Sequence, residues 1–169
     1  MPSRRSRIAV AASLAAALLG LGHAATSAYW AQGGTALLDT IGGDIERWGR
    51  QRDPSVVGAL WAIAVVKAVV ALAAPAIAGR PTWLPRWTAG RAPRILSWIA
   101  SITLVAYGGF LTVVGLLVQS GLVPAGSDAD RRALAWHAFV WDPWFFLWGT
   151  AFLVTLLLTR SSGRRPGAR

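Results

Sequence analysis

The sequence contains no cysteine among its 169 residues. This absence excludes disulfide bonds, thiolate metal sites and thiol redox chemistry within the chain. Charged residues are also scarce, at 14% of the chain, whereas soluble domains usually contain about 25%. The few charges lie between long apolar runs, and apolar residues make up 54% of the sequence. This combination predicts an integral membrane protein.

Several motifs of well-known enzyme classes are absent as well. The sequence has no Walker loop, no dinucleotide-binding glycine fingerprint, no HExxH zinc motif and no nucleophile elbow. The net charge of +10 comes largely from arginines that flank hydrophobic segments, where basic residues set membrane orientation. We therefore expect no nucleic-acid partner. The two histidines lack metal-ligand spacing, so we predict neither a metal site nor a cofactor, and haem held by His23 and His137 is disfavoured.

What the chain does contain is four long apolar runs, at about residues 8–31, 56–78, 95–118 and 138–159. Each is long enough to cross a bilayer, which takes roughly 20 helical residues. We predict one all-α membrane domain over residues 1–169, a four-helix bundle that ends in a basic tail at 160–169. The two halves share no sequence similarity that would support an inverted transporter repeat.

The first run has a second interpretation. Its basic start, its Ala/Leu-rich centre and the small residues from Gly22 to Ala28 resemble a signal peptide, which would remove about residues 1–28. The apolar run exceeds the roughly 7–15 residues of a usual signal core, which favours a retained helix.

The distribution of arginines predicts the orientation. With the N-terminus inside, the inner segments carry eleven basic residues and the outer loops five. Six of the seven acidic residues also fall in the outer loops, and the exception, Asp142, lies beside one. We therefore expect a multi-pass protein of the cell membrane with both termini in the cytoplasm.

The first outer loop has a helical apolar pattern. Leu37, Leu38, Ile41, Ile45 and Trp48 recur at near-helical spacing, and the charged residues fall between them. This pattern predicts either a short amphipathic helix on the membrane surface or a loop folded over the bundle.

Five polar residues fall in the outer half of the predicted bundle and form a candidate pocket: His23, Tyr29, Lys67, Tyr107 and Asp142. Lys67 is the sharpest clue, because a lysine at the centre of a membrane helix costs about 2.5–3.5 kcal/mol and usually faces the protein interior or a wet cavity. It can be a ligand-facing cation or a proton-handling amine, it can form a structural ion pair with Asp142, or it can snorkel to the interface.

The remaining polar residues also have structural explanations. His23 suits a hydrogen-bonded position between helices. Asp142 precedes Pro143, so it can be the N-cap of the fourth helix, with 136–141 as a surface lead-in. One helix face carries the aromatic residues Trp141, Trp144, Phe145, Trp148 and Phe152, which favours interface anchoring and packing over an aromatic cage for a quaternary amine.

Three segments together resemble a known family: Tyr29-Trp30-Ala31-Gln32-Gly33-Gly34, Ile41-Gly42-Gly43-Asp44-Ile45-Glu46, and Trp141-Asp142-Pro143-Trp144-Phe145-Phe146-Leu147-Trp148-Gly149. The chain resembles the small bacterial membrane proteins called DUF3995, from His23 through the fourth helix. The resemblance implies a four-helix integral membrane protein and supplies no catalytic residues.

These observations leave three function classes. The first is a binding or accessory membrane protein whose partner is a lipid-like ligand or another membrane protein. The second is a small membrane enzyme or a subunit that handles protons or electrons. The third is a small transporter or a channel formed by oligomerisation. The polar pocket and the bilayer setting favour the first class.

Overall fold

The computed structural model describes residues 3–79 and 81–159. Every regular element in these residues is a helix, so the predicted all-α class is confirmed. Four helical stretches are long and apolar enough to cross a membrane: α1 (Arg4–Ala31), α3 (Pro54–Ile77), α4 (Arg91–Gln119), and the stretch Arg131–Leu158 that ends in α6. They overlap the four predicted runs, and each exceeds the roughly 20 residues that a crossing needs.

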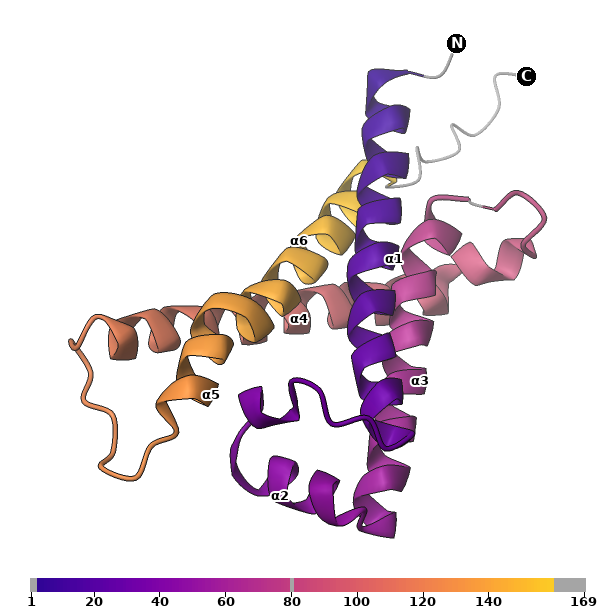
Figure 1. The fold of residues 1–169 in the computed structure, drawn as a ribbon. Coiled ribbons are helices and arrows are strands. Elements are labelled where there is room, and N and C mark those ends of the chain that lie inside the picture. Colours follow the sequence, from indigo (N-terminus) through magenta and orange to yellow (C-terminus); the bar gives the residue numbers. More distant parts are fainter. Residues whose placement is uncertain (1–2, 80, 160–169) are drawn as a thin grey trace, which may run out of the picture.

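The first packing unit is the pair α1 and α3, which lie side by side (Figure 1). Small residues permit their close approach. A Cβ added at Gly20 would lie 2.6 Å from the Cβ of Ala71 and equally close to the Trp148 ring. Only glycine therefore fits at this crossing, and the contact brings α6 against α1 as well.

The second packing unit is α4 with α6 (Asp142–Leu158). A Cβ at Gly108 of α4 would lie 2.4 Å from the backbone nitrogen of Phe146, and a Cβ at Gly149 of α6 would lie 2.7 Å from that of Val105. These two backbones thus approach through glycine. Apart from Ser97, Ser101 and Gly108, α4 has no buried residue, and most of its large apolar side chains are exposed, as lipid-facing residues are.

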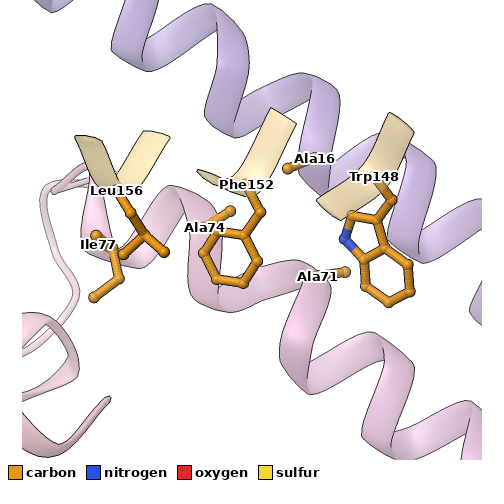
Figure 2. Packing of buried hydrophobic residues seen from close by; sticks show 7 residues of the cluster. All are labelled: Ala16, Ala71, Ala74, Ile77, Trp148, Phe152 and Leu156. Carbon is orange, nitrogen blue, oxygen red and sulfur yellow. The ribbon is translucent and has the colours of Figure 1, made fainter. Parts of the chain in front are cut away.

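The two units meet through α1 and α6 and diverge elsewhere, with α4 extending away from α1 and α3 (Figure 1). The main core lies where α1, α3 and α6 meet. Figure 2 shows Trp148, Phe152 and Leu156 of α6 in a row against small residues of the other two helices. The core is therefore a row of large side chains from α6 packed against alanines and Ile77.

The segment between α1 and α3 folds back over one end of the molecule. It contains a short 3-10 turn (Leu38–Thr40) and α2 (Gly43–Gln51). Leu38 is fully buried, in a second core cluster with Trp30, Leu60 and Trp141, whereas Ile45 and Trp48 of α2 are exposed. The apolar residues predicted to share one surface are thus divided between a loop packed on the core and an exposed helix.

The start of α3 is capped by the residue before its first proline. The side chain of Asp53 accepts hydrogen bonds from the backbone N–H groups of Ser55 and Val56 and from the Ser55 hydroxyl. These bonds, the hydroxyl first, hold the pKa of Asp53 below its usual value. Pro54 follows at the first helical position, where no backbone donor is lost.

The fourth crossing begins earlier than predicted. Residues Arg131–Trp136 form α5, capped by the Asp130 side chain, and a π-helical segment at His137–Trp141 joins α5 to α6. The interpretation of Asp142 as an N-cap is therefore wrong: its side chain accepts no capping bond, and the helix runs through it. Trp141 is likewise buried rather than part of a surface lead-in. The residue that caps this helical stretch is Asp130, six residues before Trp136.

At each end of the molecule, residues that are far apart in the sequence are in contact. At one end, the Arg5 side chain donates to the Leu158 carbonyl and Arg94 donates to the Leu156 carbonyl, so arginines cover the C-terminus of α6. At the other end, Arg132 pairs with Asp39 at 3.1 Å. The start of α1 and the end of α6 therefore lie at one end, and the two long connections lie at the other. A short 3-10 turn (Arg86–Ala89) precedes α4.

Candidate functional site

The centre of the candidate site is a hydrogen-bonded group of three side chains from α1 and α3, here called the lysine cluster: Lys67, His23 and Ser27. Lys67 Nζ lies 3.1 Å from His23 Nδ1 and donates to Ser27 Oγ at 2.9 Å. His23 and Ser27 are one helical turn apart on α1, so one ammonium reaches both. Lys67 is the single lysine of the chain and is half-buried, whereas His23 and Ser27 are buried.

The chemistry of the pair assigns the histidine tautomer. An ammonium has only donors, so His23 Nδ1 must accept, and the imidazole proton lies on Nε2. Among the described residues, Nε2 has no hydrogen-bond partner although it is buried. An unmade bond of this kind costs about 1–3 kcal/mol. The expected hydrogen-bonded histidine between helices is thus present but only half satisfied.

The charge of Lys67 is not balanced by a carboxylate. All seven acidic residues of the sequence lie in the described part of the chain, and no ion pair there includes Lys67. The predicted alternative of a Lys67–Asp142 ion pair is therefore wrong. An ammonium can donate three hydrogen bonds, and Lys67 makes two. The third N–H donor has no hydrogen-bond acceptor among the described residues.

The wall of the lysine cluster is aromatic. The His23 ring lies 4.2 Å from the Phe145 ring and 5.2 Å from that of Trp144, measured between centroids. Lys67 Nζ lies 5.6 Å from the Phe145 centroid, within the range of a cation–π contact. Phe145 therefore touches both members of the pair and forms the side of the cluster that α6 contributes.

A second polar pair lies in the π-helical segment. His137 Nδ1 lies 3.3 Å from Asp142 Oδ1, and the Asp142 side chain is only 5% exposed. These residues are five apart, so an α-helix would point them to different sides. The i→i+5 bonding of a π-helix brings such residues together, and here the Asp142 N–H bonds to the His137 carbonyl. Such segments are frequent at functional sites.

The other two predicted residues take different positions. Tyr107 of α4 is 49% exposed and meets Phe145 edge to face, with ring centroids 5.5 Å apart. Tyr29 is 47% exposed and packs under Gly34, where its hydroxyl accepts from the Ala36 N–H. The structure thus joins His23 directly to Lys67, places Tyr107 across Phe145 from them, pairs Asp142 with His137, and leaves Tyr29 against the loop.

Two contributors to the site carried a weak sequence signal. Phe145 belongs to the aromatic face for which the sequence predicts interface anchoring, and nothing in the sequence distinguishes it from its neighbours. The His137–Asp142 pair was missed because a five-residue spacing has no meaning in α-helical periodicity. In the described part of the chain, no group of three His, Asp or Glu side chains lies close enough to hold a metal ion.

Comparison with known proteins gives a family. A family model described as "Protein of unknown function (DUF3995)" matches residues 19–152. The chain belongs to the DUF3995 family. The match includes the lysine cluster, Phe145 and the His137–Asp142 pair, and it ends within α6. No curated protein and no solved structure matches the chain.

Proposed function

We propose that this DUF3995 protein is an integral membrane protein that binds a membrane-soluble ligand, and that its lysine cluster holds the anionic group of that ligand. The observation that carries the proposal is the unbalanced ammonium of Lys67. It lies in a helix that can cross the membrane, keeps one free donor and has no carboxylate partner in the described residues. Intramembrane charges of this kind usually mark a functional site, because an uncompensated charge is costly there.

The depth of the cluster suits a ligand that enters from the bilayer. Ser27 and His23 lie about 6 and 12 Å from the end of α1 at Ala31, at 1.5 Å per residue. The Lys67 side chain leans toward the N-terminus of α3, which brings its ammonium to the same level. We further propose a four-helix membrane bundle with both termini in the cytoplasm, so that the cluster lies in the outer half. The inner-segment arginines support this orientation.

The exposed side of α2 completes the proposed setting. Ile45 and Trp48 are 49% and 41% exposed, and the first turn of α2 carries Asp44 and Glu46. An apolar side next to charged residues suits a helix that lies on the outer membrane surface. In that position, α2 would cover the end of the bundle nearest the lysine cluster.

Native mass spectrometry of the purified protein tests the proposed function. We expect wild type to retain a small-molecule adduct that Lys67→Met loses, because methionine is an unbranched side chain only one atom shorter than lysine and carries no charge. Val66→Met is the matched control: it adds the same side chain at an adjacent position that is 61% exposed, and it should keep the adduct.

The spectra also decide against the alternatives. Identical adducts in wild type and Lys67→Met, or none in either, would contradict the proposal. A defined oligomer without an adduct would instead favour the transporter class, since a pore can then form between copies.

A further inference from the structure

We infer that the ligand is a long-chain carboxylate: its head binds Lys67 and its single acyl chain lies in the groove between α3 and α4. The inference rests on the proposed function and adds the chemical class and the pose of the ligand. Three observations support it: the free donor of Lys67, the size of the groove, and the position of the groove on the same helix faces as Lys67 and Phe145.

The head site is suited to a small anion. Lys67 has one free N–H and its side chain is half-buried, so a single oxyanion can complete the third hydrogen bond and neutralise the charge together. A quaternary amine head is excluded, because it would place a second cation beside the ammonium. A neutral alcohol can accept the hydrogen bond but leaves the charge unbalanced.

The tail site is an apolar groove between the two packing units. Val69 and Val70 of α3 face Leu96 and Ala100 of α4 across it, and Phe152 of α6 lies between them. Its volume is about 270 Å³. Val69 and Leu96 are more than 60% exposed, so the groove opens toward the bilayer and an acyl chain can enter sideways.

The groove and the head site share one face of the molecule. Val70 follows Lys67 by three residues on α3, and Phe152 follows Phe145 by seven residues on α6. Both spacings place the pairs on the same side of their helices, about one and two turns apart. A chain lying along the groove therefore leads to the ammonium at its outer end. In the proposed orientation the head would lie at the depth of the lysine cluster, about midway along α3, and the tail would run from there toward the inner end of the bundle, where α4 begins.

The size of the groove favours one chain over two. Pockets for drug-sized ligands usually enclose about 300–1,000 Å³, and this groove falls just below that range. A two-chain phospholipid would leave one chain outside. A fatty-acid anion has a single chain and a compact charged head, so the groove can hold part of its one chain while the head binds Lys67.

The test is binding of defined probes to the full-length protein in detergent, read as adducts by native mass spectrometry. The probes are hexadecanoate, octanoate, hexadecanol and dioleoyl phosphatidylglycerol. We expect hexadecanoate to bind at least about tenfold more tightly than octanoate, because each buried methylene contributes favourably. Hexadecanol, which lacks the charge, should bind at least about tenfold more weakly than hexadecanoate, because its hydroxyl can accept the hydrogen bond but cannot neutralise the ammonium charge.

Variants separate the head from the tail. Ala100→Phe fills the groove and should weaken hexadecanoate binding by about fivefold or more, since displaced apolar contacts are lost. Ile99→Phe adds the same ring to a residue 57% exposed on the adjacent side of α4 and should bind as wild type does. The wild-type chain-length series tests the inference even if Ala100→Phe fails to fold.

The outcomes distinguish the two proposals. Lys67-dependent binding that ignores chain length and Ala100→Phe would overturn the acyl-chain inference and leave the proposed function standing. Preferential binding of phosphatidylglycerol would also overturn it, in favour of a two-chain lipid. Equal hexadecanoate binding by wild type and Lys67→Met would overturn both.

Discussion

At the scale of single residues, the free-energy cost of placing the charged Lys67 in a membrane helix is the main reason for the proposed function. A lysine at the centre of a membrane helix costs about 2.5–3.5 kcal/mol. Hydrogen bonds to His23 and Ser27 and the nearby Phe145 ring offset part of this cost, yet none of them carries a negative charge. A purely structural role would be served as well by an apolar residue, and this is the reason for the proposed anionic ligand.

Glycine at position 149 is the residue on which the contact between α4 and α6 depends. A Cβ there would lie 2.7 Å from the backbone nitrogen of Val105 and 3.0 Å from the backbone carbonyl carbon of Leu104. We predict that Gly149→Ala destabilises the protein by about 1–3 kcal/mol, because the backbones must separate. The readout is the thermal unfolding midpoint in detergent.

Gly58 provides the matched control for this substitution. It also lies within a helix, and a Cβ there would meet nothing within 4 Å. Gly58→Ala should therefore leave the unfolding midpoint unchanged or raise it slightly, by up to about 1 kcal/mol of stability, because alanine favours helix. Equal midpoints for Gly149→Ala and Gly58→Ala would show that the close approach is not needed.

Some of the site could be predicted from residue identity and depth. Lys67 and His23 were singled out because both are polar residues in apolar runs at matching depth, and the structure brings them within hydrogen-bond distance. The choice of partners could not be predicted. Asp142 is the only acidic residue within a crossing, so pairing it with Lys67 was reasonable, but His137 lies nearer to it.

At the scale of elements, hydrophobic length predicted the helices and local chemistry set their ends. The fourth helical stretch begins at Arg131 because Asp130 accepts from the N–H groups of Arg132 and Ala133. The third begins at Arg91 even though Pro93 follows, because proline is tolerated in the first helical turn. Apolar runs contain neither signal, so the observed boundaries extend into the polar flanks.

The π-helical segment is the place where α-helical periodicity predicts the wrong neighbours. One extra residue at 137–141 rotates everything before it relative to α6. It aligns His137 with Asp142, and in this arrangement Trp141 donates to Thr40 in the first loop. A regular α-helical wheel of this stretch would therefore give the wrong neighbours for the residues that precede α6.

At the scale of the whole molecule, the packing is two helix pairs joined along one seam. The sequence predicted four crossings but not their pairing, because the apolar faces of α3 and α4 offer no unique partner. Small residues determine which helices pair: Gly20 permits the close contact of α1 with α3, and Gly108 that of α4 with α6. The open side between α3 and α4 leaves the groove that Val70 and Ala100 line.

The proposed orientation makes a whole-molecule prediction. Alkaline phosphatase folds to its active form only outside the cytoplasm. We expect a fusion at the C-terminus to be inactive and one inserted at Gly126, between α4 and α5, to be active, because basic residues favour the inner side. The reverse pattern of activity would place the lysine cluster in the inner half of the bilayer.

The central claim, that Lys67 binds an anionic group, is tested most directly by labelling Lys67 itself. Because the chain contains a single lysine, protein grown with [6-13C]lysine gives one side-chain Cε signal in a heteronuclear NMR spectrum. The protein is placed in phosphatidylcholine nanodiscs and titrated with hexadecanoate, phosphatidylglycerol or hexadecanol. The account predicts a saturable shift of this signal with at least one of the two anionic amphiphiles and none with hexadecanol. A signal that stays fixed with both anions would contradict it.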